Sequence, residues 1–214
     1  MKEKLVVVGV GGFGREVMWQ IQQIGNYYIL GYVDSNETLI NKLINGLPVL
    51  GTEDWLLQLK ESINVVIAIG SPNVRKSISE RLQVNPYIKF PTILADDVRF
   101  SSTVTFGRGC IVCSSSVLTV NVTLNEFVIL NLDCTVGHDV IISSFVTVHP
   151  SVNISGNSTI EKCVEIGTGT SIIQGKRIGE SAIIGAGSVV VKDIPAYCTA
   201  VGTPAMPIKF TNGI

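Results

Sequence analysis

Residues 124–159 read, in groups of six, LNEFVI LNLDCT VGHDVI ISSFVT VHPSVN ISGNST. The first residue of every group is large and apolar, and the fifth is small or β-branched. Both rules hold from Leu94 to Pro195, with Lys176 as the exception at the fifth position. The first position is occupied by Leu94, Phe100, Phe106, Val112, Leu118, Leu124, Leu130, Val136, Ile142, Val148, Ile154, Ile160, Ile166, Ile172, Ile178, Ile184 and Val190.

A fixed sequence period is typical of a solenoid, in which each unit buries its apolar face by stacking on its neighbours. A period of six fits neither an amphipathic helix nor a simple alternating strand. It fits a short strand with inward side chains followed by a bend, and three such sides of six residues close a triangular coil of eighteen. Strand layers lie roughly 4.8 Å apart, so the repeats predict a prism roughly 27 Å long. A sandwich of ordinary short strands would instead predict irregular turns.

The composition limits the possible partners. Hydrophobic residues make up 46% of the chain and charged residues 15%, which excludes a disordered protein. A net charge of −1 without a local Lys/Arg run predicts no nucleic-acid partner. The apolar start breaks at Gly9 without a cleavage site, and no stretch approaches the ~18 apolar residues of a membrane span. We therefore expect a cytoplasmic protein without a membrane partner.

The cysteines and histidines predict no metal site. The five cysteines are odd in number, and Cys110 and Cys134 occupy fifth positions, where a free thiol acts as a small hydrophobe. Cys110 and Cys113 form a C-x-x-C pair, but the βα context of a redox motif is missing. With only His138 and His149 present, one chain cannot build a three-histidine site.

Residues 1–90 are expected to alternate strands and helices around a small parallel sheet, in the manner of half a Rossmann fold. The pattern predicts strands over 5–9, 28–33 and 64–70. It predicts helices over 13–24, from Thr52 and from Ser71 to about Leu82, with hydroxyl N-caps at Thr52 and Ser71. The seam lies between Asn85 and Pro91, which gives a nucleotide-sugar-binding domain over 1–90 and a β-helix with a C-terminal tail over 91–214.

The stretch from Gly9 to Gly14 is a G-x-G-x-x-G between a strand and a helix, followed by Asp34. Glycines allow the backbone to approach a phosphate, and a helix N-terminus supplies partial positive charge. A NAD-dependent dehydrogenase is one alternative, although a dinucleotide normally spans two such halves. A turn that needs glycine for purely structural reasons is another. The candidate nucleotide-sugar residues are Gly9, Gly11, Gly12, Phe13, Asp34, Ser35 and Gly70.

The repeats also carry a family resemblance. Ile166-Gly167, Ile178-Gly179 and Ile184-Gly185-Ala186-Gly187 resemble the hexapeptide-repeat acyltransferases, whose prism is a left-handed β-helix. The general preference for right-handed crossovers would have argued for the opposite hand. A Gly-rich βαβ unit before the prism resembles the sugar acetyltransferases of the sialic acid O-acetyltransferase type. Ala68-Ile69-Gly70 followed by Arg75, and the tail from Val201 to Ala205, extend this resemblance over the whole chain.

The resemblance implies an active site on the prism. His138 corresponds to the general base and Asp139 to the acid that raises its basicity. Acetyl-CoA is the implied cosubstrate, with contacts at Thr147, Thr168, Ala186 and Gly202, between the subunits of a homotrimer. Relatives commonly have a second histidine where this chain has Thr147. His149 follows two residues later, and its role stays open.

The implied reaction is acetyl transfer to the amine of a nucleotide-linked amino sugar, in surface polysaccharide or glycan biosynthesis. O-acetylation of sialic acid or another sugar hydroxyl is an alternative, because the sequence does not distinguish the two acceptors. Phe13 departs from nucleotide-sugar relatives, which often have His there. A non-enzymatic β-helix scaffold with a nucleotide-binding domain is the third hypothesis, although a scaffold has no need for an exposed Gly-His-acid element.

Overall fold

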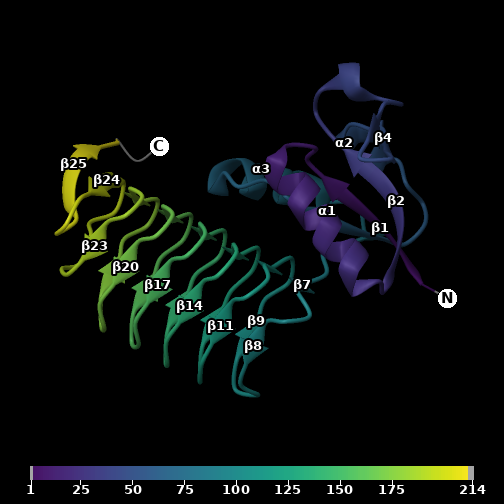
Figure 1. Cartoon of the computed structure of the whole chain (residues 1–214). Coiled ribbons are helices and arrows are strands. Elements are labelled where there is room, and N and C mark those ends of the chain that lie inside the picture. The colour runs from purple at the N-terminus through teal and green to yellow at the C-terminus, as the bar shows by residue number, and fades with distance from the viewer. Residues whose placement is uncertain (1, 212–214) are drawn as a thin grey trace. The chain divides into compact units, whose positions relative to one another are not determined.

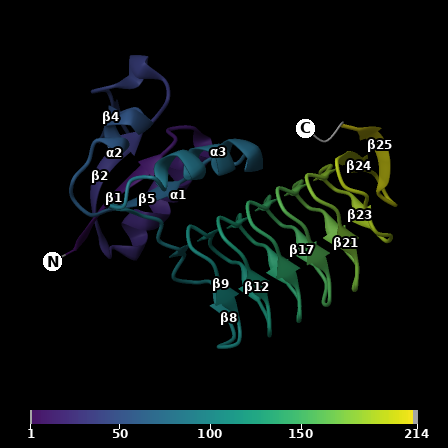
Figure 2. The same ribbon diagram turned by 180° about the vertical axis from the view of Figure 1, so that it is seen from behind.

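The structure is a computed structural model that describes residues 2–211. The chain forms two compact units, the first ending at Ile93 and the second beginning at Leu94. Residues 1 and 212–214, which belong to the two predicted domains, lie outside the described residues. Each unit is described by itself, and Figures 1 and 2 show the course of the chain in each from opposite sides.

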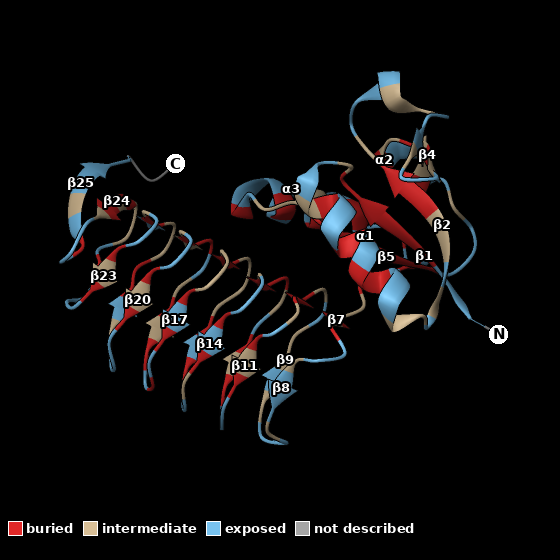
Figure 3. Cartoon of the chain, in the orientation of Figure 1, coloured by how far each residue is buried: buried red, intermediate tan, exposed pale blue. Residues whose placement is uncertain are grey.

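The first unit contains a six-stranded sheet in the order β3-β4-β2-β1-β5-β6. All neighbouring strands are parallel except β3 and β4, which form an antiparallel hairpin. Figure 3 shows β1 buried and α1 with one exposed face. The elements are β1 (Glu3–Val8), α1 (Gly12–Ile24), β2 (Tyr27–Val33), the 3₁₀ helix η1 (Glu37–Leu39), β3 (Leu43–Ile44), β4 (Leu47–Gly51), α2 (Glu53–Leu57), β5 (Ile63–Ile67), α3 (Pro72–Leu82) and β6 (Ile88–Lys89).

The three predicted strands and the helices that follow β1 and β5 are confirmed. Strands β3, β4 and β6 were not predicted. Strands β3 and β6 have two residues each, too few to show alternation, and Pro48 and Gly51 obscure the pattern of β4. Strand β6 lies inside the stretch that we expected to be the seam.

The predicted N-cap positions are confirmed, but the hydrogen bonds expected of their hydroxyl groups are not formed. Thr52 and Ser71 occupy the N-cap positions of α2 and α3, and both have extended backbone, but neither side chain makes a cap hydrogen bond. Helix α2 ends at Leu57, so Leu59 lies outside it. Thr and Ser at these positions therefore predicted where each helix begins, although their hydroxyl groups do not form the expected hydrogen bond.

The second unit is a left-handed parallel β-helix, and its two-residue strands recur every six residues. The strands are β7 (Ile93–Leu94), β8 (Arg99–Phe100), β9 (Thr105–Phe106), β10 (Ile111–Val112), β11 (Val117–Leu118), β12 (Thr123–Leu124), β13 (Ile129–Leu130), β14 (Thr135–Val136), β15 (Ile141–Ile142), β16 (Thr147–Val148), β17 (Asn153–Ile154), β18 (Thr159–Ile160), β19 (Glu165–Ile166), β20 (Ser171–Ile172), β21 (Arg177–Ile178), β22 (Ile183–Ile184) and β23 (Val189–Val190).

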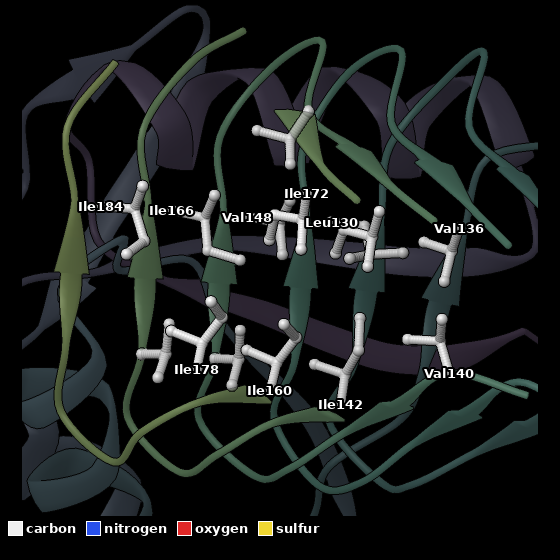
Figure 4. Packing of buried hydrophobic residues seen from close by; sticks show 14 of the residues in the cluster. Leu130, Val136, Val140, Ile142, Val148, Ile160, Ile166, Ile172, Ile178 and Ile184 are labelled. Carbon is white, nitrogen blue, oxygen red and sulfur yellow. The ribbon is translucent and has the colours of Figure 1, made fainter. Parts of the chain in front are cut away.

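Each strand pairs in parallel with the strand three places later in the chain, so the strands form three sheets along the axis. Thr135 pairs with Val117, and Asn153 with Thr135, each eighteen residues apart (135 − 117 and 153 − 135). The predicted coil of eighteen residues is therefore confirmed. The first-position side chains from all three sheets meet inside the coil, as Figure 4 shows for Leu130, Val136 and Ile142 among others.

In all but the terminal groups, the fourth residue turns the corner with positive φ. This series of left-handed residues recurs every six positions from Gly109 to Gly187 and is mostly not glycine. Asn and Asp tolerate this conformation better than other side chains, as at Asn121 (φ 56°) and Asp139 (φ 58°). The corner residues of successive coils lie one above another, so any chemistry at a corner depends on its axial neighbours.

Both ends of the prism depart from the repeat. Phe100 is 47% exposed, and Leu94 and Phe106 are only partly buried, because β7, β8 and β9 each pair with a coil on one side only. After β23 the repeat gives way to a hairpin of β24 (Cys198–Val201) and β25 (Met206–Phe210), which was not predicted. Strand β24 pairs with β22 and so extends one of the three sheets.

In the described part of the chain, no helix is both long and apolar enough to cross a bilayer. The exposed large apolar residues of the prism are distributed over several of its strands and corners and are not confined to one face. They are Phe100, Val120, Leu132, Ile141, Ile173, Ile183, Val191, Met206, Ile208 and Phe210.

Candidate active site

His138 lies at the corner between β14 and β15. We use the name His138 corner for this corner and for the residues directly above and below it in the neighbouring coils. Its Nδ1 is 2.9 Å from Oδ2 of Asp139, and the two side chains are 49% and 47% exposed. The backbone oxygen of His138 accepts a hydrogen bond from the amide of Asn157 in the next coil, at 2.8 Å. The corner therefore presents an imidazole–carboxylate pair on a backbone anchored to its neighbour.

Glycine in the next coil leaves the space for the imidazole ring. Gly156 follows His138 by eighteen residues (156 − 138), and a Cβ on Gly156 would clash with Nε2 and lie 2.5 Å from Cε1 of His138. A Cβ on Gly137 would lie 2.7 Å from the amide nitrogen of Gly156. Neither glycine has positive φ. The backbone of the next coil leaves no room for a side chain at Gly137, whereas the missing Cβ at Gly156 leaves room for the imidazole in its present orientation.

Asp139 has two tasks at this corner. It is the left-handed residue that turns the chain. Its Oδ1 also accepts a hydrogen bond of 3.0 Å from the side-chain amide of Asn121 in the previous coil. The hydrogen bond from Asn121, followed by that from His138, holds the pKa of the Asp139 carboxyl below its usual value. Asp139 is therefore ionised and oriented toward the imidazole at neutral pH.

A second histidine–carboxylate pair lies at a different corner. Nε2 of His149 is 2.9 Å from Oε1 of Glu165, with side chains 33% and 35% exposed. His149 follows β16, whereas His138 follows β14 in a neighbouring sheet. Within one chain the two histidines therefore belong to separate corners.

Three of the four coenzyme candidates lie along one edge of the prism, at or beside the stacked corners that follow β16, β19 and β22. We call these stacked corners the Thr168 corner. Thr168 and Ala186 are exposed and lie in register eighteen residues apart (186 − 168). The third, Gly202, has φ 98° and donates its amide hydrogen to Oγ of Ser188 at 3.1 Å. Thr147, on β16, is 1% exposed. One chain thus carries His138 and these candidates at different corners of the prism.

The seven nucleotide-sugar candidates meet at one edge of the first unit's sheet. Gly9 to Phe13 follow β1, Asp34 and Ser35 follow β2, and Gly70 follows β5, and these three strands are neighbours. The carboxyl ends of neighbouring parallel strands share an edge, and ligands bind there at the switch point of the strand order. This switch point lies between β1 and β5, where α1 and α3 begin.

The glycines of this edge divide into two groups. Gly9 has φ 103°, and a Cβ on Gly14 would clash with the backbone oxygen of Gly9, so both serve the tight turn. A Cβ on Gly11, Gly12 or Gly70 would meet nothing within 4 Å. The fold therefore explains Gly9 and Gly14, whereas at the other three positions the structure leaves open space.

Two charged side chains hold the loops at this edge. Asp34 accepts hydrogen bonds from the amides of Val10, at 3.0 Å to Oδ2, and of Asn36, at 3.0 Å to Oδ1. Arg75, fully buried on α3, donates from Nη1 to the backbone oxygens of Ile69 at 2.6 Å and Gly70 at 3.0 Å. Asp34 is thus a loop-shaping residue of the site, in addition to being a candidate ligand contact.

Sequence reasoning assigned no role to Asn121, Gly156 or Arg75. The first two could have been found from the period, since Asn121 precedes Asp139 and Gly156 follows His138 by one coil of eighteen residues. Arg75 was noted only within a family motif, because no sequence spacing reveals which carbonyl groups a buried guanidinium reaches.

Among residues 2–211, no three His, Cys, Asp or Glu side chains are grouped so as to hold a metal ion. The five cysteines are free and buried. Burial raises the pKa of the Cys134 thiol to about 11, so this thiol is not a nucleophile near neutral pH.

Comparison with known proteins matches both units. The family model of the PglD N-terminal domain matches residues 4–82. The acetyltransferase domain of PglB from Neisseria gonorrhoeae FA1090, in complex with acetyl coenzyme A, is 32% identical with a TM-score of 0.91, over 97% of this chain and 100% of that one. A variant of perosamine N-acetyltransferase from Caulobacter crescentus, in complex with CoA and GDP-perosamine, has a TM-score of 0.89, over 98% of this chain and 97% of that one; at 24% identity it shows a likeness of fold.

A shorter match by sequence falls on the galactoside O-acetyltransferase of Lactococcus lactis, which is 50% identical over 40 residues, 19% of either chain. The chain spans about a fifth of the length of the relatives that it matches in this way.

We predict that Asn121→Gly raises the pKa of Asp139 toward its ordinary value, because the variant removes the main hydrogen-bond donor to the charged carboxylate. Glycine tolerates the positive φ at this corner, so the fold should persist. Carbon-detected NMR titration of the Asp139 carboxyl measures the effect. Asn157→Gly is the matched control, because Asn157 lies one coil beyond Asp139 and has nearly the same φ, 57°. An unchanged Asp139 titration in Asn121→Gly would contradict the assigned role of Asn121.

Proposed function

Because the chain belongs to the family of acetyltransferases that includes the PglB domain, we propose that it transfers an acetyl group from acetyl-CoA to the amine of a nucleotide-linked amino sugar. The observation that carries this proposal is the exposed His138–Asp139 pair, with Gly156 leaving room for the ring. The bound acetyl coenzyme A of the PglB domain supports the choice of donor, and the GDP-perosamine of the Caulobacter structure supports the class of acceptor.

In the proposed mechanism, His138 acts as a neutral general base. An ionised Asp139 next to Nδ1 favours the tautomer that carries its proton on Nδ1, which leaves the lone pair of Nε2 to accept a proton. As the amine attacks the thioester carbonyl, the N–C bond forms and Nε2 takes the amine proton. The C–S bond then breaks, and the coenzyme leaves as a thiolate that regains the proton. No acyl-enzyme forms, so none of the buried cysteines takes part.

We further propose that the active enzyme is a homotrimer. His138 and the residues of the Thr168 corner lie at different corners of one prism, so a single chain does not place the base beside the proposed coenzyme contacts. In a ring with threefold symmetry, the His138 corner of one copy can face the Thr168 corner of the next. Thr168, Ala186 and Gly202 are the proposed acetyl-CoA contacts, whereas the burial of Thr147 argues against a direct contact at that residue.

The proposed nucleotide-sugar site is the carboxyl edge of β1, β2 and β5. The open space at Gly11, Gly12 and Gly70 supports a ligand that approaches the backbone closely, as a diphosphate does. Helix α1 begins at Gly12, so its first amide groups lie next to this space. Asp34, Ser35 and Phe13 are the proposed side-chain contacts.

O-acetylation of a sugar hydroxyl is the second candidate, which the match to a galactoside O-acetyltransferase favours. A base at His138 would serve either acceptor. A thiol-release assay with acetyl-CoA separates the two candidates, with nucleotide 3- and 4-amino sugars in one arm and free or CMP-linked sialic acid and galactosides in the other. A purely structural scaffold would release no thiol in either arm. We place the reaction in the cytoplasm, in the synthesis of a surface polysaccharide or glycan.

We predict that His138→Asn lowers kcat by ~10²–10⁴-fold, which is the usual contribution of a general base. Asp139→Asn should lose less, because its charge acts through the imidazole and is partly screened by water. Steady-state kinetics with the best acceptor measures both effects, and circular dichroism and acetyl-CoA affinity serve as controls for the fold. If His138→Asn retains more than about a tenth of the wild-type kcat, the base lies elsewhere.

The shared site predicts complementation between two inactive variants. His138→Asn removes the base, and Ala186→Glu places a bulky charge at the Thr168 corner. Each variant alone should be nearly inactive, whereas co-expression should restore about a quarter of the wild-type activity, since one interface in four combines two intact corners. No recovery in hybrid trimers, or a 23.0 kDa monomer by sedimentation, would reject the shared site.

Gly11→Val should weaken nucleotide binding strongly, because its side chain would fill the space that the proposed diphosphate occupies. Gly11 has φ −62° and ψ −177°, which valine adopts readily, so the unit should stay folded. Calorimetry with UDP, dTDP and GDP measures the effect, and Gly46→Ala, at a remote turn, is a control for general loss of stability. Wild-type affinity in Gly11→Val would leave Gly11 without a binding role.

A further inference from the structure

Arg75 is the most deeply buried charge in the first unit, and the proposed mechanism does not use it. Its side chain is 0% exposed on α3, although an arginine side chain keeps its charge in a protein. Burying a guanidinium is unfavourable unless hydrogen bonds satisfy it. The partners that it finds include two successive carbonyl groups of the loop between β5 and α3.

These two hydrogen bonds determine how the loop faces the site. In a trans peptide, the C=O and N–H groups point in opposite directions. When Arg75 holds the oxygens of Ile69 and Gly70, the amide groups of Gly70 and Ser71 are turned away from the guanidinium. Ser71 is exposed at the N-cap of α3, and Pro72 at the first helical position has no N–H to offer. Pro72 thus removes one amide donor from the start of α3, and the loop amides of Gly70 and Ser71 add to those of the first helical turn.

The same loop also contacts the Gly-rich turn. A Cβ on Gly9 would lie 2.7 Å from Cδ1 of Ile69 and 3.1 Å from the backbone oxygen of Ala68. The side chain of Ile69 thus packs against Gly9, directly before the residues that we assign to the nucleotide. A shift of the loop would move both sides of the switch point between β1 and β5.

We propose that Arg75 is a positioning residue for the nucleotide diphosphate: without touching the ligand, it fixes the loop from Ile69 to Ser71 in the conformation that binds phosphate. This inference rests on the proposed nucleotide-sugar site. Arg75 then contributes to the preference for nucleotide-linked acceptors over free sugars. The loop amides that Arg75 orients interact with phosphate oxygens, which a free sugar lacks.

Arg75→Met tests the proposal, because it keeps much of the side-chain length but removes all five donors. We expect the dissociation constant for the nucleoside diphosphate to rise at least about tenfold, as for loss of hydrogen bonds to a charged group. The KM for the nucleotide sugar should rise in parallel, while kcat at saturation and the KM for acetyl-CoA stay within about twofold. Arg75→Lys, whose single ammonium can hold part of the carbonyl pair, should restore part of the affinity.

Arg81→Met on the same helix is the matched control, since Arg81 is half exposed and pairs with Asp54 at 2.7 Å. Calorimetry uses UDP, dTDP and GDP, and the nucleotide that wild-type protein binds most tightly serves for all variants. If wild-type protein binds none of them, the proposed nucleotide site itself fails, and this inference with it. If wild-type protein binds and a folded Arg75→Met binds equally well, only the role of Arg75 fails.

A merely structural role would instead lower kcat and weaken both substrates together, and that result would also overturn the proposal. Where Arg75→Met does not fold, Arg75→Lys decides. A folded Arg75→Lys with weakened nucleotide binding and unchanged acetyl-CoA affinity supports the proposal. Wild-type affinity in Arg75→Lys, together with wild-type affinity in Ile69→Ala, which loosens the same loop against Gly9, overturns it.

Discussion

The stacking of one coil on the next, in strict register, is the constraint on which the second unit depends. From Val112 to Val190, each large first-position residue is buried among those of the neighbouring coils, and full burial of such a side chain contributes about 1.5–3 kcal/mol. The register requires every corner to turn after the same number of residues, which explains the unbroken series of positive φ angles from Gly109 to Gly187. An insertion of one residue would move the apolar side chains out of the interior.

The His138 corner uses this register for chemistry. A corner residue has axial neighbours above and below, and here they are Asn121 on one side of Asp139 and Gly156 on the other side of His138. One neighbour supplies a hydrogen bond to the carboxylate, and the other supplies empty space for the imidazole. Asp139 also shows how a structural and a chemical requirement can coincide, since aspartate suits both a left-handed corner and the orientation of a histidine.

The first unit positions its loops by a different means. Its sheet ends in three loops at one edge, and two buried or half-buried charges hold them, with Asp34 accepting from the amide of Val10 and Arg75 donating to Ile69 and Gly70. Backbone groups anchored in this way lose little further freedom when a ligand binds, which lowers the cost of association. The rigid corner and the anchored loops are both preorganised, one by stacking and the other by side-chain hydrogen bonds.

A family resemblance singled out His138 and Asp139, and the sequence by itself determined the β-helix, its coil of eighteen residues and the βαβ unit before it. These features follow from local patterns, a period of six and a G-x-G-x-x-G between strand and helix, because local spacing decides which side chains face inward. Only the tertiary structure decided that Asn121 and Gly156 complete the His138 corner, that Thr168 and Ala186 share another corner, and that Arg75 holds the loop after β5. It also added β3, β4, β6 and the terminal hairpin, whose strands are short or contain proline and so show too little alternation to be recognised from sequence. Contacts across coils and between loops depend on how the chain returns on itself, and no short stretch of sequence contains that information.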